Sequence, residues 1–466
     1  MNQMPIMTYF AASLKSGNPM RENLKLEVTY KQILQMSLPI SFAILVPQFN
    51  FLINSFFLAQ LGKGYMGASG VTGVYYLIFS VIGFGLNNGL QALISRRAGQ
   101  DRLKEIGTLF MQSVYISFFI ALIGIIITYT VAPQIFRSFT GIAIYTPTIE
   151  FLKIRIWGLP FLYLYQMRNG LLVGTNQSKL LVYGTLAETI TNIVLDYGLI
   201  FGNLGMPKLG FNGAAYASIA AEFLGMAVVF MVIGIKGMSK RFGLFETLTF
   251  DWENTKTILV QSSPLILQYA ISIISWEFFF ILVSHDGPLA LDISQVMRLM
   301  FGFFGIFIWA FAATSNTMVS NIIGQGLHEK VTLLVKKIIT LSLGSTIVLL
   351  LPIQFFAKDL LSIFNQDPDF LALAIPVFRV VCTAIVFMSV STVCLNAVTG
   401  TGNTKINLMI EIFTIVLYCI YVYTVMEVYN LSIIWGWGSE WVYWLTILTL
   451  SSLYLNSGNW KKKMNI

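Results

Sequence analysis

Charged and metal-binding residues are scarce in this sequence. Asp, Glu, Lys and Arg make up 11% of its 466 residues, whereas a soluble domain carries about 25%. This difference excludes a soluble protein. The sequence has two histidines, His285 and His328, which are predicted at opposite membrane faces, and three cysteines, Cys382, Cys394 and Cys419, without CxxC spacing. Neither a disulfide framework nor a zinc site is therefore expected.

Long apolar runs take the place of the missing charge. Hydrophobic residues make up 56% of the chain, and its mean hydropathy is +0.74. Apolar stretches of about 20 residues, enough to cross a hydrocarbon core as a helix, recur from end to end. The sequence predicts an all-α polytopic membrane protein with twelve transmembrane helices. These cover residues 31–60, 66–95, 107–131, 147–173, 179–202, 213–236, 255–284, 289–322, 332–356, 370–398, 405–428 and 432–456.

The basic residues predict how these spans are oriented. With the N-terminus in the cytoplasm, 20 of the 29 Lys and Arg residues lie on the inner side. The outer loops then hold only Lys63, Arg137, Lys208 and Lys358. This positive-inside pattern predicts two cytoplasmic termini, and it explains the net charge of +8 without nucleic acid as a partner. The segment before the first span lacks the basic start and apolar core of a signal peptide.

The two halves of the chain share short motifs at a nearly constant spacing. Three pairs recur with residue numbers that differ by 225 or 226: SLP (37–39) and SSP (262–264), ISRRAGQ (94–100) and VSNIIGQ (319–325), GTNQSK (174–179) and GTGNTK (400–405). Such a parallel duplication predicts two six-helix lobes related by a pseudo-two-fold axis along the membrane normal. The expected parts are a cytoplasmic tail (1–30), an N-lobe (31–236), a cytoplasmic linker (237–254), a C-lobe (255–456) and a basic cytoplasmic tail (457–466).

Several longer motifs stand at the ends of the predicted spans or within them. They are SLPISF and INSFFLAQLG in the first span, GLQALISRRAGQ closing the second, NIVLDYGLIFG with LGFNGAAYAS across the fifth and sixth, and VTGTGNTK after the tenth. These motifs resemble those of the multidrug and toxic compound extrusion (MATE) family, within the wider superfamily of multidrug exporters and lipid-linked oligosaccharide and polysaccharide flippases. The resemblance covers roughly residues 30–456. It implies two six-helix lobes, alternating access, and export of drug-like or metabolite molecules against inward H⁺ or Na⁺ flow.

A polar stripe lies within the apolar fifth span. Glu188, Asn192 and Asp196 are four residues apart, so they share one face of a helix. A carboxylate inside a membrane span costs at least about 2.5–3.5 kcal/mol, and such residues often mark ion pathways. The resemblance implies that Asn192 and Asp196 form part of a cation site in the N-lobe. Ser218 of the sixth span is assigned to the same site. Helix packing is the alternative for all of these residues.

The first span departs from the family pattern. The family usually has an aspartate eight residues before a glycine in this span, and counting back from Gly62 leads to Asn54. Two nearby carboxylates disfavour joint ionisation, and that mutual effect is missing when one partner is an amide. The site therefore either works with fewer charges or coupling has moved elsewhere. Pro39 and Pro47 in the same span each remove a backbone hydrogen bond and predict a bend, which is either static or part of the transport cycle.

The second half has one leading candidate and several weaker ones. Glu277 is a lone acid in the seventh span, and it resembles a second coupling site. Arg298 of the eighth span is a candidate ion-pair partner, which would make Glu277 structural. The family's acid in the tenth span is replaced, since counting back from Gly400 leads to Met388. For the remaining intramembrane acids, Glu222, Glu411 and Glu440, hydrogen bonding between helices is expected.

Secondary active export is the leading hypothesis from the sequence. It predicts a monomer in the bacterial cytoplasmic (inner) membrane that exchanges an amphiphilic, cationic organic molecule for H⁺ or Na⁺, with membrane lipid around it and no cofactor beyond that ion. No GxxxxGK[ST] motif for ATP occurs. A flippase for lipid-linked sugars is the alternative, with four candidate phosphate ligands: Arg155, Arg168, Arg298 and Arg379. A membrane-embedded transferase is not favoured, because clustered acids or histidines for a metal are missing.

Overall fold

The described chain consists almost entirely of α-helices. The structure, a computed structural model, describes residues 24–139, 142–246 and 248–462. The predicted N-terminal tail up to residue 23 and the end of the predicted basic tail after residue 462 lie outside the described residues. No strand occurs in the described ranges. The all-α fold class is therefore confirmed.

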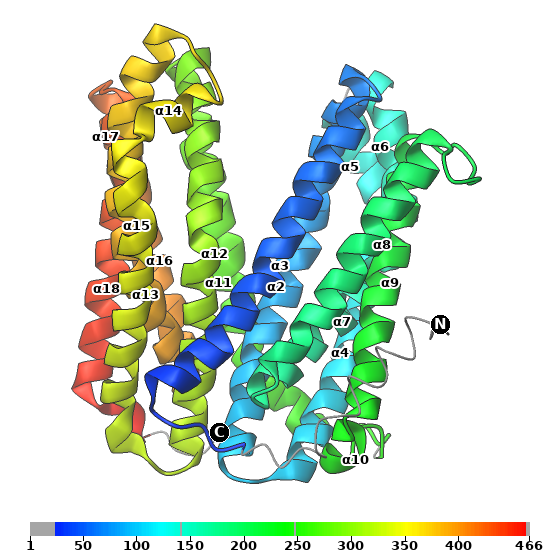
Figure 1. Ribbon diagram of the computed structural model, residues 1–466, viewed down its shortest axis with the longest axis vertical. Helices are drawn as coiled ribbons and strands as arrows, with labels where there is room; N and C mark the ends of the chain where they lie inside the picture. Colours follow the sequence, from blue (N-terminus) through cyan, green and yellow to red (C-terminus); the bar gives the residue numbers. More distant parts are fainter. Residues whose placement is uncertain (1–23, 140–141, 247, 463–466) are drawn as a thin grey trace, which may run out of the picture. The chain divides into compact units, whose positions relative to one another are not determined.

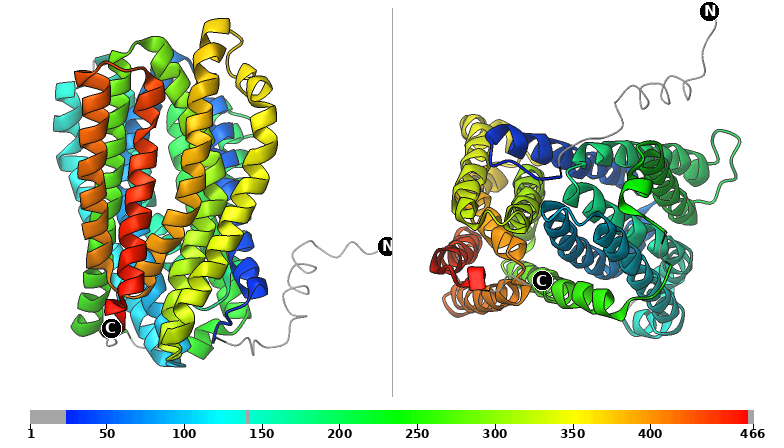
Figure 2. Two further views of the ribbon diagram at one scale, coloured as in Figure 1. Left: turned by 90° about the vertical axis from the view of Figure 1, so that its left-hand side faces the viewer. Right: turned by 90° about the horizontal axis from the view of Figure 1, so that it is seen from below.

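The chain divides into two compact units. Within the described residues, unit 1 contains Leu24, Lys25 and Phe42–Leu259, and unit 2 contains Leu26–Ser41 together with the chain from Val260 onward. In each unit the long helices run side by side (Figures 1 and 2). Each unit therefore consists of most of one half of the chain and a short segment of the other half.

Unit 1 is a bundle in which α8 packs against α9 and α3 packs against α7. Small residues bring α8 and α9 close together. A Cβ on Gly225 of α9 would lie 2.8 Å from the Cβ of Glu188 on α8, so only glycine fits there. The helices are α2 (Tyr30–Ala59), α3 (Lys63–Gly99), α4 (Leu103–Thr130), α5 (Ala132–Phe139), α6 (Ile142–Arg155), α7 (Leu159–Gly174), α8 (Leu181–Phe201), α9 (Phe211–Ile235) and α10 (Met238–Phe242).

Unit 2 has a continuous apolar core. Buried residues of α11, α12 and α15 form much of it, and it includes the fully buried Trp437. Trp437 Nε1 donates to Ser294 Oγ of α12 at 3.1 Å, so the one polar atom of this side chain is satisfied. The helices are α11 (Trp252–His285), α12 (Pro288–Gly324), α13 (Val331–Phe355), α14 (Ala357–Ser362), α15 (Pro368–Gly400), α16 (Thr404–Tyr423) with a π-helical turn (Thr424–Val428), α17 (Ile433–Trp437) and α18 (Ser439–Ser457).

Nine of the described helices are long and apolar enough to cross a membrane by length and composition. The fourth predicted span, 147–173, is interrupted: α6 and α7 are joined by a 3₁₀ turn at Ile156–Gly158. Neither piece alone has the length of a span. The fifth predicted span is α8, which has 21 residues but is made less apolar by its polar stripe. Helices therefore lie in all twelve predicted ranges, but the fourth is divided between α6 and α7, and the twelfth, 432–456, between α17 and α18.

The first helix of each half begins on the opposite unit. Helix α2 starts at Tyr30 in unit 2 and passes into unit 1 after Ser41, two residues beyond Pro39. Helix α11 starts at Trp252 in unit 1 and passes into unit 2 after Leu259, five residues before Pro264. Pro39 and Pro264 are partners in the sequence repeat. Both repeats therefore begin their first helix in the opposite unit.

Amide side chains hold both of these helix starts. In unit 2, the backbone N–H of Leu26 donates to Asn321 Oδ1 at 2.9 Å, and Gln325 Nε2 donates to the Leu26 carbonyl at 3.0 Å. In unit 1, the N–H of Asp251 donates to Gln112 Oε1 at 3.1 Å, and Gln112 Nε2 donates to the Thr249 carbonyl at 3.0 Å. Leu26 and Asp251 occupy equivalent positions in the two halves, because their separation along the chain equals the spacing of the repeat.

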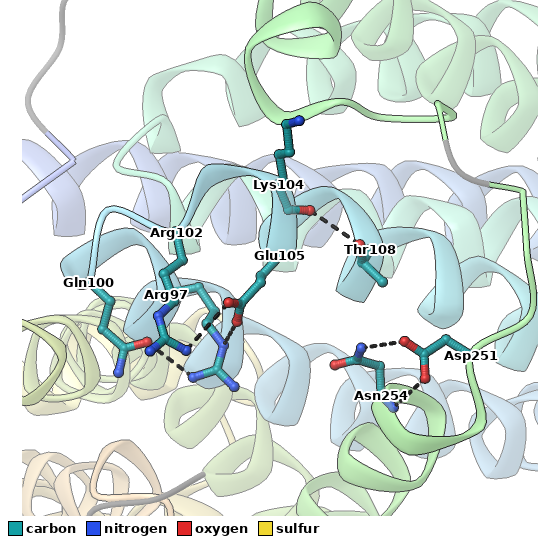
Figure 3. A network of polar contacts seen from close by, with 8 residues as sticks. All are labelled: Arg97, Gln100, Arg102, Lys104, Glu105, Thr108, Asp251 and Asn254. Carbon is teal, nitrogen blue, oxygen red and sulfur yellow. Dashed lines mark hydrogen bonds and ion pairs between the residues drawn. The ribbon is translucent and has the colours of Figure 1, made fainter.

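Side-chain contacts fix the turn before α4 and the start of α11 (Figure 3). Arg97 Nε lies 2.7 Å from Glu105 Oε2, which ties the end of α3 to the first turn of α4. Asp251 precedes α11, and its Oδ1 accepts from the N–H groups of Glu253 and Asn254. The Asn254 amide, which donates to Oδ2 at 2.6 Å, together with these N–H groups lowers the pKa of Asp251. The cap is therefore fully formed at neutral pH and weakens only as acid protonates Asp251.

Replacing Gln112 is expected to loosen the start of α11. Gln112→Ala removes the side-chain amide that bonds to Thr249, Asp251 and Thr255. A buried polar group left without its hydrogen-bond partner costs about 1–3 kcal/mol of stability. Hydrogen–deuterium exchange should become faster at the Asp251 amide. Ser113→Ala is the matched control, because Ser113 Oγ donates only within its own helix, to Phe110 O at 2.6 Å. Equal exchange in the two variants would contradict the proposed anchoring.

Candidate functional site

The polar stripe of the fifth span lies on one continuous helix. Glu188, Asn192 and Asp196 all lie on α8, one turn apart from one another. Asn192 and Asp196 are buried, with 3% and 1% of their surface exposed. Glu188 lies about 12 Å from Asp196 along the helix axis at the normal rise per residue. The stripe therefore has two separate environments.

Helix α2 brings two further amides beside α8. Asn50 Nδ2 donates to Asn192 Oδ1 at 2.8 Å. About two turns further along both helices, the Phe57 ring lies 5.7 Å from the Phe201 ring, edge to face. The two helices thus run in the same direction here, and Asn54, one turn after Asn50, lies level with Asp196, one turn after Asn192. The sequence did not single out Asn50, although its spacing of four residues from Asn54 was the available signal.

Several polar atoms of this group have no partner. The buried atoms without a hydrogen bond among the described residues include both carboxylate oxygens of Asp196, Oδ1 of Asn50, Oδ1 of Asn54 and Nδ2 of Asn192. An ionised carboxylate that is buried without donors costs several kcal/mol. The group therefore favours a neutral carboxyl or a bound cation. Its free atoms are mostly oxygens, the ligand type that hard cations prefer.

Glu188 lies in a second group, which carries charges of both signs. Arg155 forms a two-bond ion pair with Glu222 of α9, in which Nη1 donates to Oε2 at 2.9 Å and Nη2 donates to Oε1. The guanidinium of Arg155 lies 3.9 Å from the centre of the Tyr76 ring. Arg168, fully buried, stacks on Tyr165 at the same distance. Glu222, Arg168 and Arg155 are the charged groups that act electrostatically on Glu188.

The structure also locates the other residues predicted in the N-lobe. Ser218 lies half-buried on α9, and no hydrogen bond joins it to Asn192 or Asp196 in the described chain. Helix α2 is a single α-helix that includes both Pro39 and Pro47. Next to Pro39, Ser41 Oγ donates to the Ser37 carbonyl at 3.0 Å. Pro39 lies at the point where α2 passes between units, and Pro47 lies within the unit 1 part of the helix.

In unit 2, Glu277 and Arg298 form the ion pair that the sequence suggested. Arg298 Nη2 lies 3.5 Å from Glu277 Oε1, and the two side chains are 40% and 49% exposed, respectively. The Arg298 guanidinium also lies 5.3 Å from the Phe280 ring. Glu277 therefore has a cationic partner and is half-exposed, whereas Asp196 is buried and has no ion pair among the described residues. A coupling role for Glu277 stays a prediction.

No site for a transition metal occurs in this part of the chain. Among the described residues, no group of three or more His, Cys, Asp or Glu side chains could hold a metal ion. His285 Nδ1 contacts Glu427 Oε1 at 2.5 Å, and both lie at the surface of unit 2. The Asp196 group instead offers carboxyl and amide oxygens, which suit a proton or a hard cation.

A family model described as MatE matches the chain twice. The matches cover residues 39–198 and 264–424. Their first residues lie 225 apart and their last residues lie 226 apart, which is the spacing of the motif repeat. The matched segments include Asn54, Asn192, Asp196 and Glu411. The internal duplication predicted from short motifs is thus confirmed over two long segments.

Relatives that are similar along most of the chain agree with this match. The chain is 23% identical over 442 residues to “Probable multidrug resistance protein NorM” of Thermotoga maritima, covering 93% of both proteins. It is 22% identical over 400 residues to an uncharacterized transporter, YisQ, of Bacillus subtilis, covering 84% of this chain and 87% of the relative.

Two solved structures share the fold. One is an outward-facing multidrug resistance MATE family transporter of the MOP superfamily, with a TM-score of 0.85 and 17% identity, covering 97% of this chain and 99% of that one. The other is a MOP superfamily transporter from Pyrococcus furiosus, with a TM-score of 0.81 and 16% identity, covering 97% of this chain and 98% of that one. Their fold of twelve helices in two lobes is the one predicted from the sequence.

Proposed function

Because the chain belongs to the MatE family, we propose that it is a secondary active exporter of amphiphilic organic molecules. It is a multi-pass membrane protein and not an enzyme, since the members of this family are transporters. The relatives named as multidrug resistance proteins support a substrate range of drug-like molecules. The single observation that carries ion coupling is the buried carboxylate of Asp196, which has no donor among the described residues.

Asp196 is the coupling acid in this proposal. A proton or Na⁺ on the carboxyl neutralises a charge that the surroundings do not balance, so the ion-bound state is the favoured one when the site is closed to water. Release of the ion requires access to water. Transport of one charge down a potential of 100 mV supplies about 2.3 kcal/mol. This energy, together with the chemical gradient, drives the substrate in the opposite direction.

The amide groups support either ion in this proposal. The Asn50, Asn54 and Asn192 side chains add carbonyl oxygens beside Asp196, and Asn50 and Asn54 each have a free one. Oxygen ligands of this kind suit Na⁺, whereas a proton needs only the carboxyl. The Asn54 amide thus replaces the family's second acid with a neutral ligand, and the number of charges at the site falls by one.

The surroundings of the protein are also part of the proposal. We place the chain in the bacterial cytoplasmic membrane as a monomer among lipids, with both termini in the cytoplasm, because Lys and Arg accumulate in the loops assigned to that side. No cofactor beyond the coupling ion and no nucleic acid are required. The substrate is expected to be an organic cation, in keeping with the aromatic content of 14%.

The arginines do not favour a flippase for lipid-linked sugars. A pyrophosphate needs several cationic groups that converge on it. Arg155 is engaged by Glu222, Arg298 lies beside Glu277, and Arg168 is fully buried against Tyr165. Only Arg379 of the four candidates is exposed without an ion pair in the described chain.

The function is tested with purified protein in liposomes. Movement of a fluorescent lipophilic cation is measured with a pH gradient and a Na⁺ gradient imposed separately. We expect one of the two gradients to drive accumulation, which identifies the ion. If neither gradient moves the cation, whereas a lipid-linked sugar is moved across the bilayer, the export proposal is wrong and the flippase alternative is correct.

A further inference from the structure

Unit 2 contains a buried carboxylate that the proposed export function does not use. Glu411 lies on α16 and is fully buried. Ser272 Oγ of α11 lies 2.6 Å from its Oε1, and Tyr443 Oη of α18 contacts the same oxygen. Gln268 Nε2 of α11 donates to Oε2 at 3.3 Å. The carboxyl group therefore connects three helices of one unit.

All the partners of Glu411 are neutral. No Lys, Arg or His forms an ion pair with it within the described residues, whereas Glu222 pairs with Arg155 and Glu277 with Arg298. An ionised Glu411 would thus be a buried charge without a counter-charge, inside a helix that is apolar enough to span a membrane. A group in this position either stays neutral or changes its proton occupancy as part of function.

The direction in which the Ser272 hydroxyl donates differs between the neutral and the ionised form of Glu411. Ser272 Oγ lies 2.8 Å from the Gln268 carbonyl and 2.6 Å from Glu411 Oε1. A hydroxyl carries one proton and cannot donate to both. If Ser272 donates to the Gln268 carbonyl, the contact with Glu411 requires a proton on the carboxyl. If Glu411 is ionised, the Ser272 hydroxyl turns and donates to Oε1 instead. Rotation of one hydroxyl therefore accommodates either form.

The same distances favour a proton over a metal ion. Even Ca²⁺, a hard cation with long bonds, stands about 2.3–2.6 Å from each oxygen ligand. An ion between two oxygens holds them much further apart than the 2.6 Å between Ser272 and Glu411. Contacts of this length are typical of an O–H donor that bonds directly to a carboxyl oxygen.

A wider network keeps the partners in place. Asn407 Nδ2 donates to Gln268 Oε1 at 2.9 Å and lies at the same distance from Thr399 Oγ1 of α15. The Gln268 amide is therefore fixed in the orientation that points its Nε2 toward Glu411. Fixed donors require little rearrangement when the carboxyl gains or loses a proton.

We infer that Glu411, with Ser272, Gln268 and Tyr443, is a second proton-binding site of the transporter, located in unit 2. In the neutral form, Glu411 Oε1–H donates to Ser272 Oγ, whose own proton goes to the Gln268 carbonyl. On deprotonation, the carboxyl proton leaves to water and the Ser272 hydroxyl turns to Oε1. The inference rests on the proposed export function, and it adds a proton site to the half of the chain that lacks Asp196.

Other titratable groups also lie on the helices packed around Glu411. The Tyr418 ring of α16 lies 5.8 Å from the Tyr443 ring. Glu440 of α18 accepts from Trp444 Nε1 at 2.9 Å. Cys394 of α15 contacts Ser452 Oγ at 3.9 Å. The other groups on these helices that can carry a charge are Glu253, Lys256, Glu277, His285, Asp369, Arg379 and Lys405, none of which bonds to Glu411 among the described residues. A titration assigned to this site must therefore be separated from that of Glu440.

Infrared spectroscopy of the full chain tests the site without transport. A protonated carboxyl has a C=O band that differs from that of a carboxylate, and the band shifts in D₂O. We expect the wild type to show such a band that disappears as the pH rises, Glu411→Gln to lack it, and Glu440→Gln to keep it. Identical pH-dependent spectra of the wild type and Glu411→Gln would overturn the inference.

A second variant keeps the test valid if Glu411→Gln does not fold. Tyr443→Phe keeps the carboxyl and the ring but removes a donor that stabilises the ionised form. The pH at which the band disappears should then rise. An unchanged midpoint in Tyr443→Phe would contradict the assignment, because a merely structural bond would leave it unmoved.

Transport measurements separate this inference from the proposed function. In liposomes, the ratio of protons to substrate, obtained from the pH gradient that just balances the substrate gradient, should fall by one in Glu411→Gln. If the wild type moves no substrate but the Glu411 band still titrates, the export function fails and the proton site stands. If the wild type exports and the ratio is the same in Glu411→Gln, the proton site is not part of coupling and the inference is wrong.

Discussion

An Asp196→Asn variant is expected to lose export driven by an ion gradient and to show only the background leak. Asparagine has nearly the shape of a neutral aspartic acid but cannot exchange a proton, and it offers a cation one oxygen instead of two. Both Asp196 oxygens are buried without a partner in the described chain. The variant therefore loses the changing charge and no hydrogen bond. Driven uptake of the fluorescent cation, at equal amounts of reconstituted protein, measures this loss.

The same substitution should leave folding intact, which separates it from damage to the bundle. Because Asn removes a desolvated charge and creates no cavity, the free energy of unfolding is expected to stay within about 1 kcal/mol of the wild type. Thermal unfolding in detergent checks this value.

Glu188→Gln is the matched control for the coupling prediction. It changes the same class of side chain on the same face of α8, two turns away, in the group that contains Arg155 and Arg168. Driven export should persist in this variant. Loss of export in Glu188→Gln, with normal export in Asp196→Asn, would show that Glu188 and not Asp196 is the coupling acid.

The helices were predictable because hydrophobicity alone determines where a chain crosses a membrane. The predicted first span, 31–60, and the observed α2, Tyr30–Ala59, agree within one residue at each end. The fifth span is similarly close, with 179–202 predicted and Leu181–Phe201 observed. The break between α6 and α7 was missed, although Gly158 and Pro160 are residues that favour a helix boundary. Apolar length hides such a break because both pieces remain hydrophobic.

The polar groups were predictable where their members lie on one helix or, as for Glu277 and Arg298, on two consecutive helices. The stripe on α8 follows from four-residue spacing. The group around Arg155 does not, because Tyr76, Arg155 and Glu222 come from three helices far apart in sequence. The exchanged helix starts were also missed, since Leu26 and Asp251 are held by backbone hydrogen bonds to amides of distant helices. Their equivalent positions in the two halves were a usable signal once the repeat was known.

Removing Arg155 is expected to destabilise unit 1 strongly. The Arg155 and Glu222 side chains are only 12% and 8% exposed. Arg155→Met keeps the length of the side chain but leaves Glu222 as a buried charge without a partner. Breaking a buried pair in this way costs about 3–5 kcal/mol. Thermal or denaturant-induced unfolding in detergent, monitored by the loss of helical circular dichroism, measures it.

The double variant Arg155→Met with Glu222→Leu distinguishes charge from packing. Replacing both members of a buried pair by apolar residues of similar size is often neutral, so most of the lost stability should return, and a double-mutant cycle gives the interaction energy. A double variant as unstable as Arg155→Met would show that the stacking on Tyr76 carries the stability. Arg155 directly precedes the 3₁₀ turn at Ile156–Gly158. Its Nη1 atom lies so close to Gly158 that a Cβ there would clash with it. The Arg155–Glu222 ion pair therefore connects the break in the fourth span to α9. The break is therefore expected to become mobile in Arg155→Met and to stay ordered in the double variant.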